Sequence, residues 1–463
     1  MTTTRLLRAA FSVIPLLLAG LSAALATGTK VAPTSVLVLR GGTVFDSHTG
    51  RMMPDQTIII RGERIEAVGP RSSLPAFPRG ARVLDLRGKF IIPGLIDAHV
   101  HLVHQLDDAH LTGDEVLPLF LAAGVTSIRD TGDSIVPQKM ISRYAEAHPE
   151  SCPRLFMCSP LIDGTPPIHR DIGWALTDPE QVPAFVEDMA KWGVTTLKIY
   201  AGTPRHIGKQ VIEAGHQHGL VVTAHLGNYR AQDAVADGVD CLEHIWSVFN
   251  YIIPEDAART PNHRATLDLT NPLARSLTAD LAQRHVLVDP TLAVFRNMIL
   301  LHDLESVNQH PDNACVPERL RQHWENYRRR SNLDPATRDV RRQEFLKYQE
   351  LTGMLHRAGV RILAGTDAPE PYVPPGFSLL QELEMLVESG LSPSAALQAA
   401  TMNNAMSLRQ ESQLGSIEPG KLADLVILTA DPTAGIRNVR HIDKVIRSGI
   451  ICEPAQLLKQ VPK

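Results

Sequence analysis

Short apolar runs alternate with helical stretches through most of the chain. Such alternation is typical of βα units, which assemble into a parallel sheet and define the α/β class. We expect eight strands, near residues 92–100, 124–129, 154–158, 194–200, 220–225, 239–244, 285–291 and 360–366. Two longer segments, about 245–280 and 293–350, interrupt this rhythm, and the second is rich in charge. Its basic runs fit a solvated helical face or a subunit contact, and a lid over the substrate is the alternative.

Both ends of the chain carry a different pattern, in which β-rich runs are separated by glycine turns. The runs at 36–39, 57–60 and 65–68 predict a small antiparallel sheet. Matching runs at 423–428 and 443–449 close the chain.

The first residues are typical of a secretory signal peptide. Arg5 and Arg8 precede an apolar run at 9–25, which ends in the small-x-small pattern Ala24-Leu25-Ala26. We therefore expect residues 1–26 to be removed and the protein to be exported, either to a periplasm or out of the cell. A membrane anchor is the alternative, but the run is short and is interrupted by a proline and a glycine.

Composition and charge narrow the choice of partners. Hydrophobic residues make up 44% and charged residues 21% of the 463, which describes an ordinary globular protein. The formal net charge of -4 would become -6 when two arginines leave with the signal peptide. This balance gives no reason to expect nucleic acid or an anionic membrane as a partner. We expect the five cysteines to be mostly buried thiols, with Cys152 and Cys158 as the one sequence-near pair.

Candidate metal ligands stand at the ends of the predicted strands. His99 and His101 end the first strand and project to the same side, so they can chelate one ion. The fourth, fifth, sixth and eighth strands end in Lys198, His225, His244 and Asp367. Barrels of eight βα units place their active sites at these strand ends. Neutral imidazoles and carboxylates are ligands for zinc or a similar divalent ion.

These motifs resemble the amidohydrolase superfamily of metal-dependent hydrolases, in its imidazolonepropionase-like and prolidase-like branch. The resemblance rests on Pro-Gly-Leu-Ile-Asp-Ala-His-x-His at 93–101, Leu-Lys-Ile-Tyr at 197–200, the two later histidines, Gly-Thr-Asp at 365–367 and Pro-Gly-Lys-x-Ala-Asp-Leu at 419–425. It covers nearly everything from Val36 onward. It implies a (β/α)8 TIM barrel at 93–411, beside a small β-sandwich that both chain ends form from 33–92 and 412–455.

The resemblance also implies a dinuclear metal site. His99, His101 and Asp367 would hold one ion, and His225 and His244 the other. An ammonium has no acceptor atom, so Lys198 would bridge the ions as a carbamate formed with carbon dioxide. The two ions, expected to be zinc, would share a hydroxide that attacks an amide carbonyl, with Asp367 as general base and acid. Asp97 would orient a ligand histidine.

Three further residues are candidates for substrate contacts. His169 and Arg170 follow the third strand, where members of the family often contact substrate. Tyr200 comes two residues after Lys198 and would point to the same face. Dipeptide-cleaving relatives often carry a tyrosine two residues after the fifth-strand histidine, where this chain has Gly227. That difference argues against an Xaa-Pro dipeptidase.

We therefore expect an exported dinuclear hydrolase that cleaves an amide (C–N) bond of a small molecule, such as a dipeptide or an N-acyl amino acid. A lactone or ester hydrolase and a mononuclear deaminase are the alternatives within the superfamily, and a deaminase would not need Lys198. An inactive binding or scaffold protein is the alternative from another class, and loss of a ligand would favour it. No stable membrane span is expected after signal removal, and the implied partners are the substrate and further copies in a homo-oligomer.

Overall fold

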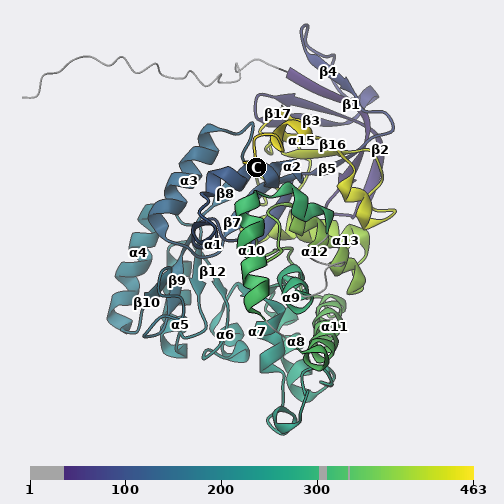
Figure 1. Cartoon of the computed structure of the whole chain (residues 1–463). Helices are drawn as coiled ribbons and strands as arrows, with labels where there is room; N and C mark the ends of the chain where they lie inside the picture. The colour runs from purple at the N-terminus through teal and green to yellow at the C-terminus, as the bar shows by residue number, and fades with distance from the viewer. Residues whose placement is uncertain (1–35, 302–309, 332–333, 463) are drawn as a thin grey trace, which may run out of the picture.

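The structure, a computed structural model, describes residues 36–301, 310–331 and 334–462 (Figure 1). The predicted signal peptide at 1–26 lies outside the described residues. Among the helices that the structure describes, none is both long and apolar enough to cross a membrane.

Parallel strands form the centre of a TIM-barrel-like α/β fold. One sheet contains β6 (Leu95–Val100), β7 (Val125–Asp130) and β8 (Arg154–Phe156). The other has the order β10-β9-β11-β12-β13-β14, whose bounds are Gly173–Ala175, Cys158–Asp163, Thr196–Ile199, Val221–Ala224, Cys241–Glu243 and Leu287–Asp289. Every strand pairing in both sheets is parallel. The predicted α/β class and all predicted strand positions except the last are confirmed.

The eighth predicted strand, near 360–366, is not a continuous strand. Two isolated parallel bridges place the segment between β14 and β6, and they join Val288 to Ile362 and Val100 to Ala368. At Ala364 the side chain of Asn404 satisfies both backbone groups, because Oδ1 accepts the N–H at 3.2 Å and Nδ2 donates to the carbonyl oxygen at 2.8 Å. A side chain thus replaces part of the strand ladder, which a hydrophobic pattern does not reveal.

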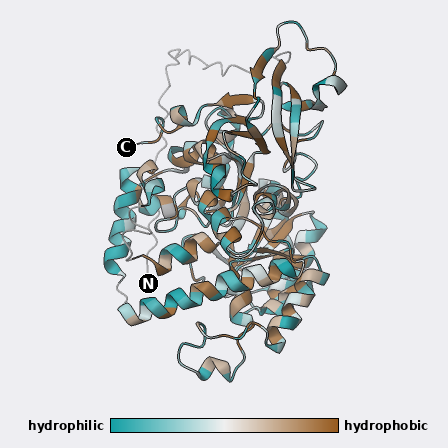
Figure 2. Ribbon diagram, turned by 90° about the vertical axis from the view of Figure 1, so that its right-hand side faces the viewer, coloured by the Kyte–Doolittle hydropathy of each residue, from teal (hydrophilic) through white to brown (hydrophobic). Residues whose placement is uncertain are grey.

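Helices follow the strands and surround them, as Figure 1 shows for α3, α4, α5 and α6. The helices that follow β6 to β13 are α2 (Gly113–Ala122), α3 (Ile135–Ala147), α4 (Val182–Trp192), α5 (Arg205–Gln217), α6 (Ala231–Asp237) and α7 (Ile245–Tyr251). α4 and α6 end at Gly193 and Gly238, whose φ angles of 83° and 99° favour glycine at a helix end. The helices in Figure 2 show hydrophilic teal next to hydrophobic brown, as expected where one face packs inward.

A third sheet contains strands from both ends of the described chain. Its order is β17-β16-β15-β5-β1-β2-β3, with β4 on β1, and the bounds are β1 Val36–Asp46, β2 Arg51–Arg61, β3 Arg64–Pro70, β4 Arg82–Asp85, β5 Phe90–Pro93, β15 Leu425–Leu428, β16 Ile442–Arg447 and β17 Ile450–Cys452. Ile91 of β5 lies opposite Ile427 of β15, so the N- and C-terminal runs share one ladder. The predicted antiparallel pairing of the runs at 36–39, 57–60 and 65–68 is confirmed, because β1 pairs antiparallel with β2 and β2 with β3. The strands β4 and β5 add to β1 in parallel.

The charge-rich segment at 293–350 is helical where it is described. It contains most of α9 (Leu292–Ile299), then α10 (Glu318–Arg330) and most of α11 (Pro335–Arg357). Arg328 and Arg329 pair with Glu325 on the same helix, and Arg341 pairs with Glu344. Much of its charge is therefore compensated within the segment.

All five cysteines are free thiols, and Cys315 alone of them is not buried. Cys152 and Cys158 do not form the disulfide that their spacing left open.

Candidate metal centre

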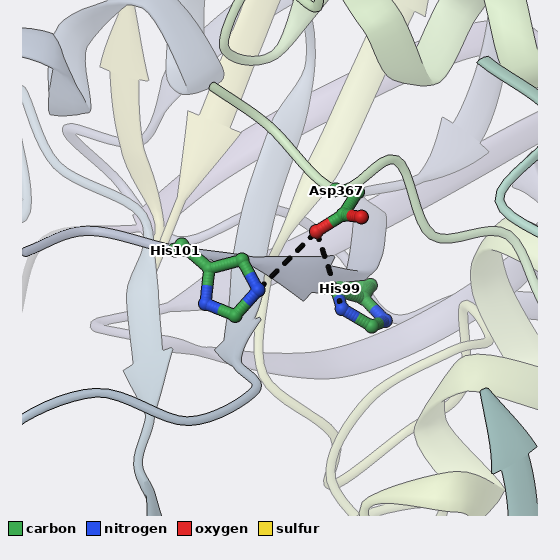
Figure 3. A group of neighbouring side chains, drawn as sticks. All are labelled: His99, His101 and Asp367. Atoms are coloured by element: carbon green, nitrogen blue, oxygen red, sulfur yellow. Dashed lines mark ion pairs between the residues drawn. The ribbon is translucent and has the colours of Figure 1, made fainter. Parts of the chain in front are cut away.

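Three of the predicted ligands meet where β6 ends. His99 and His101 lie two residues apart, and the Nε2 atoms of their rings are 3.4 Å and 3.2 Å from the same oxygen, Oδ1 of Asp367 (Figure 3). Asp367 is placed by its backbone, since its N–H donates to the carbonyl oxygen of His99 at 2.8 Å and its φ is 66°. The sequence-based expectation that these three residues converge is met by the geometry.

The other three predicted ligands line the same cavity, which has a volume of about 310 Å³. The ring of His244 lies 4.6 Å from that of His99 and 4.6 Å from that of His225, measured between centroids. Nδ1 of His244 is 2.8 Å from the hydroxyl of Thr291. Lys198 points into this cavity from β11 with 1% of its surface exposed.

Burial favours the neutral form of three of the candidate ligand histidines. It lowers the pKa of His99 to about 4 and that of His225 to about 3, and the nearby charge of Lys198 adds to both shifts. Burial also holds the pKa of His244 well below its usual value, together with His225. An unprotonated imidazole keeps a lone pair for a metal ion.

The carboxyl group of Asp367 is ionised. Burial would raise its pKa, but His99, His101 and His244 around it hold the pKa well below the usual range. It can therefore bind a cation or accept a proton.

The buried ion pair of Arg129 and Glu243 contacts the ring of His99. Oε2 of Glu243 lies 2.8 Å from Nδ1 of His99, and its Oε1 accepts a hydrogen bond from Nη2 of Arg129 at 2.6 Å. Although burial opposes ionisation, Arg129 and Lys198 hold the pKa of Glu243 well below its usual value. The ring of His99 is thus oriented by a carboxylate, a common arrangement for metal-binding histidines.

Asp97 does not orient the His99 ring as expected. Its Oδ1 accepts from the backbone N–H of His99 at 3.2 Å, and its Oδ2 accepts from the hydroxyl of Thr366 at 2.8 Å. It fixes the backbone, while Glu243 acts on the ring. An arginine at 129 and a glutamate at 243 within apolar strands were the available signal, because buried charges of opposite sign tend to pair.

His104, which also lies near the candidate ligands, was not singled out from the sequence. Nδ1 of His104 lies 2.8 Å from Oδ1 of Asp133, and these two residues form a further group with His101 that could hold a cation. His99, Glu243 and Asp289 form another such group.

The predicted substrate contacts differ in position. Nε2 of His169 is 2.9 Å from the hydroxyl of Tyr200, and both residues line the cavity. Arg170 is exposed and is not among the lining residues. The cavity wall also contains residues that the sequence did not single out, namely Ile172, Trp246, Val294, Phe295, Met298 and Glu370.

Comparisons with known proteins bear on the family and the fold of the chain. The sequence model of the amidohydrolase family matches residues 90–452. An adenine deaminase of Rubrobacter xylanophilus is 25% identical over 434 residues, which is 92% of this chain and 59% of the relative. The chain thus spans about three fifths of that relative's length. An imidazolonepropionase of Anaeromyxobacter sp. (strain K) is 28% identical over 161 residues, 32% of this chain and 36% of the relative. Among solved structures, a Bifidobacterium longum protein assigned as a prolidase has a TM-score of 0.68 and 25% identity, covering 93% of this chain and all of its own.

Proposed function

The chain belongs to the amidohydrolase family, and from this premise we propose that it is a dinuclear metal-dependent hydrolase that cleaves the amide bond of a small molecule. The substrate class is a dipeptide or an N-acyl amino acid. The convergence of four imidazoles, one ionised aspartate and one buried lysine on a single cavity is the observation that carries this proposal.

The donor set fits two divalent ions bridged by a modified lysine. Nζ of Lys198 is buried and has no hydrogen-bond partner in the part of the chain that the structure describes, and the same holds for Nε2 of His99. A buried ammonium without a partner costs several kcal/mol. Addition of carbon dioxide to the Nζ amine, with loss of a proton, would turn this donor into an anionic oxygen ligand.

We assign one ion to His99, His101 and Asp367, the other to His225 and His244, and the bridge to the carbamate of Lys198. Nitrogen and oxygen donors of this kind suit zinc. When bound, such ions would polarise the amide carbonyl and make water a nucleophile at neutral pH.

The side chains around the cavity supply the remaining steps. The ionised Asp367 accepts a proton from the attacking water and delivers it to the leaving nitrogen. Glu243 keeps the ring of His99 in place. The hydroxyl of Tyr200, which lies 2.9 Å from Nε2 of His169, can donate a hydrogen bond to a substrate oxygen. Arg170 is exposed, and a contact with substrate would require its loop to move over the cavity.

A mononuclear deaminase is the second candidate, because a relative along 92% of the chain is an adenine deaminase. Lys198 discriminates between the two, since one ion needs no bridge. A lactone or ester hydrolase is a third, because the same attack suits an ester carbonyl.

We further propose that residues 1–26 direct export, which the apolar run at 9–25 supports. The two ends, 33–92 and 412–455, would form one β-sandwich beside the catalytic barrel at 93–411. The ladder between β5 and β15 supports this division. Exposed apolar side chains on α3, Val136 and Met140, support a homo-oligomer.

The test is the metal content of the mature protein, grown with zinc and bicarbonate and then dialysed. Two equivalents per chain are expected, with hydrolysis of dipeptides or N-acyl amino acids. Lys198→Ala should lose metal and activity, whereas Lys191→Ala, at an exposed lysine on α4, should lose neither. One equivalent with release of ammonia from adenine would favour the deaminase, and a metal-free, inactive protein would refute the proposal.

A further inference from the structure

A second cavity adjoins the one over the candidate metal centre. Its volume is about 460 Å³, and the two cavities share three lining residues, Trp246, Phe295 and Met298. The remaining lining residues of the second cavity come mostly from α9, α10 and α11, in the segment whose role the sequence left open. The two cavities therefore lie on either side of these three side chains.

Aromatic rings connect the two cavities. The ring of Phe295 lies 6.0 Å from that of His244 and 5.3 Å from that of Tyr348, which lines the second cavity. Trp246 lies 5.9 Å from His225. The wall is thus apolar from the ligand histidines outward, which suits a hydrocarbon group.

The two charged side chains that line the second cavity in the described part of the chain pair with each other. Arg341 and Glu344 are its charged lining residues, and they pair at 3.0 Å. The buried Glu344 also accepts from Arg264 at 3.0 Å and from the hydroxyl of Tyr348. Among the described residues, the other side chains that line the second cavity are uncharged and mostly apolar, which favours an apolar group as its occupant.

We propose that the second cavity receives the acyl chain of an N-acyl amino acid whose acyl group is a straight hydrocarbon chain of medium or greater length. This inference rests on the proposed amide hydrolysis. The scissile amide lies at the metal centre, and the acyl chain passes Met298 into the second cavity. Water adds to the carbonyl carbon, the C–N bond breaks, a proton passes to nitrogen, and a carboxylic acid and a free amino acid are released.

The direct test is a series of N-acylglycines from acetyl to decanoyl, assayed with the metal-loaded enzyme. Each methylene that enters an apolar site contributes about 0.8 kcal/mol, or about a fourfold rise in kcat/KM. We expect such a rise along the series, followed by a plateau when the cavity is full. Equal kcat/KM for acetyl- and decanoylglycine would overturn the inference.

The variant Ile299→Trp tests whether the acyl chain of the substrate lies in the second cavity. Ile299 ends α9 and lines the second cavity but not the first, so the larger side chain of Ile299→Trp would fill part of the second cavity. The ratio of kcat/KM for decanoylglycine to kcat/KM for acetylglycine should then fall by at least about tenfold. Val83→Trp, at a residue on β4 that is 42% exposed and lines neither cavity, should leave the ratio unchanged. An unchanged ratio in a folded Ile299→Trp enzyme would contradict the assignment. If that variant does not fold, the chain-length series of the unaltered enzyme decides alone.

Calorimetry separates this inference from the proposed function, because it measures binding of the straight-chain acids themselves to the metal-loaded protein. Decanoate binding much more tightly than acetate, with no N-acylglycine hydrolysed, would support the cavity assignment and refute amide hydrolysis. Hydrolysis without any dependence on chain length would do the reverse. Neither hydrolysis nor chain-length-dependent binding would overturn both.

Discussion

Replacement of Glu243 by glutamine tests whether the buried ion pair behind His99 is needed. The variant keeps the size of the side chain but removes its charge. Arg129 would then be left fully buried and without a counterion at the 2.6 Å contact, with its Nε still donating to the carbonyl oxygen of Ala98. No hydrogen-bond partner for its Nη1 exists among the described residues. Asp289 is the other carboxyl group whose charge acts on Arg129, but burial and Glu243 raise its pKa well above the usual value, so it is a poor counterion while it stays protonated.

The expected cost follows from that uncompensated charge. Removing one partner of a buried ion pair lowers the free energy of unfolding by about 3–5 kcal/mol. Thr223→Val is the matched control, because the hydroxyl of Thr223 donates to the same carboxylate but carries no charge. Loss of a neutral hydrogen bond costs about 1 kcal/mol.

Urea denaturation of the metal-free variants gives both values, and chelator competition gives the metal affinity. Glu243→Gln should also weaken metal binding by about 10- to 100-fold, because the ring of His99 loses the carboxylate that orients it. If Glu243→Gln is no more destabilising than Thr223→Val, charge compensation is not what the pair supplies. The reasoning fails in that case even if activity falls.

Two further predictions concern packing and pH. Gly365→Ala should destabilise the protein by about 1–3 kcal/mol or more and lower its metal content, because the added Cβ would lie 2.7 Å from Cβ of His99. Gly435→Ala is the control, since its added Cβ would have no neighbour within 4 Å. In thermal unfolding, this control should be close to neutral. Arg328 is the largest of the causes that lower the pKa of Glu325 to about 2 from 4.5. A carboxyl group whose pKa is lower in the folded than in the unfolded protein stabilises the fold at pH values above its unfolded pKa, and this stabilisation is lost as the pH falls toward its folded pKa. Glu325→Gln should therefore lower Tm at pH 7. The difference in Tm from the unaltered protein should shrink below about pH 4.5. A difference in Tm that is independent of pH would contradict this assignment.

The positions of the candidate ligands were predictable because each depends on local geometry. Two histidines at alternate positions of a strand share a face whatever the rest of the fold does, so His99 and His101 could be paired from the sequence. The end of an apolar run likewise placed Lys198, His225 and His244. These inferences used the strand period, the rule that barrel sites lie at the carboxyl ends of strands, and the match of these residues to motifs of the amidohydrolase family.

What the sequence did not predict depends on contacts between distant segments. The link between Arg129 and Glu243 spans 114 positions, and Asn404 replaces a strand ladder from 40 residues away. The second cavity is formed by helices of an insertion whose sequence pattern indicates only a charged surface. The ion pair of Glu344 with Arg264, 80 positions away, becomes visible only when the helices are packed.

Two equally buried carboxyl groups near His99 show how the fold selects which one is ionised. Glu243 and Asp289 are both fully buried, yet the pKa of Glu243 is held well below its usual value, whereas that of Asp289 is raised well above it. Burial acts on both, so the difference comes from their partners: Glu243 contacts Arg129, while the oxygens of Asp289 have no hydrogen-bond partner among the described residues. Nδ1 of His99 is 2.8 Å from Glu243 and 3.9 Å from Asp289, so the charged group is the nearer one. Nδ1 of His99 therefore carries the proton that it donates to Glu243, and the lone pair of Nε2 faces the cavity, where the proposed metal site requires it.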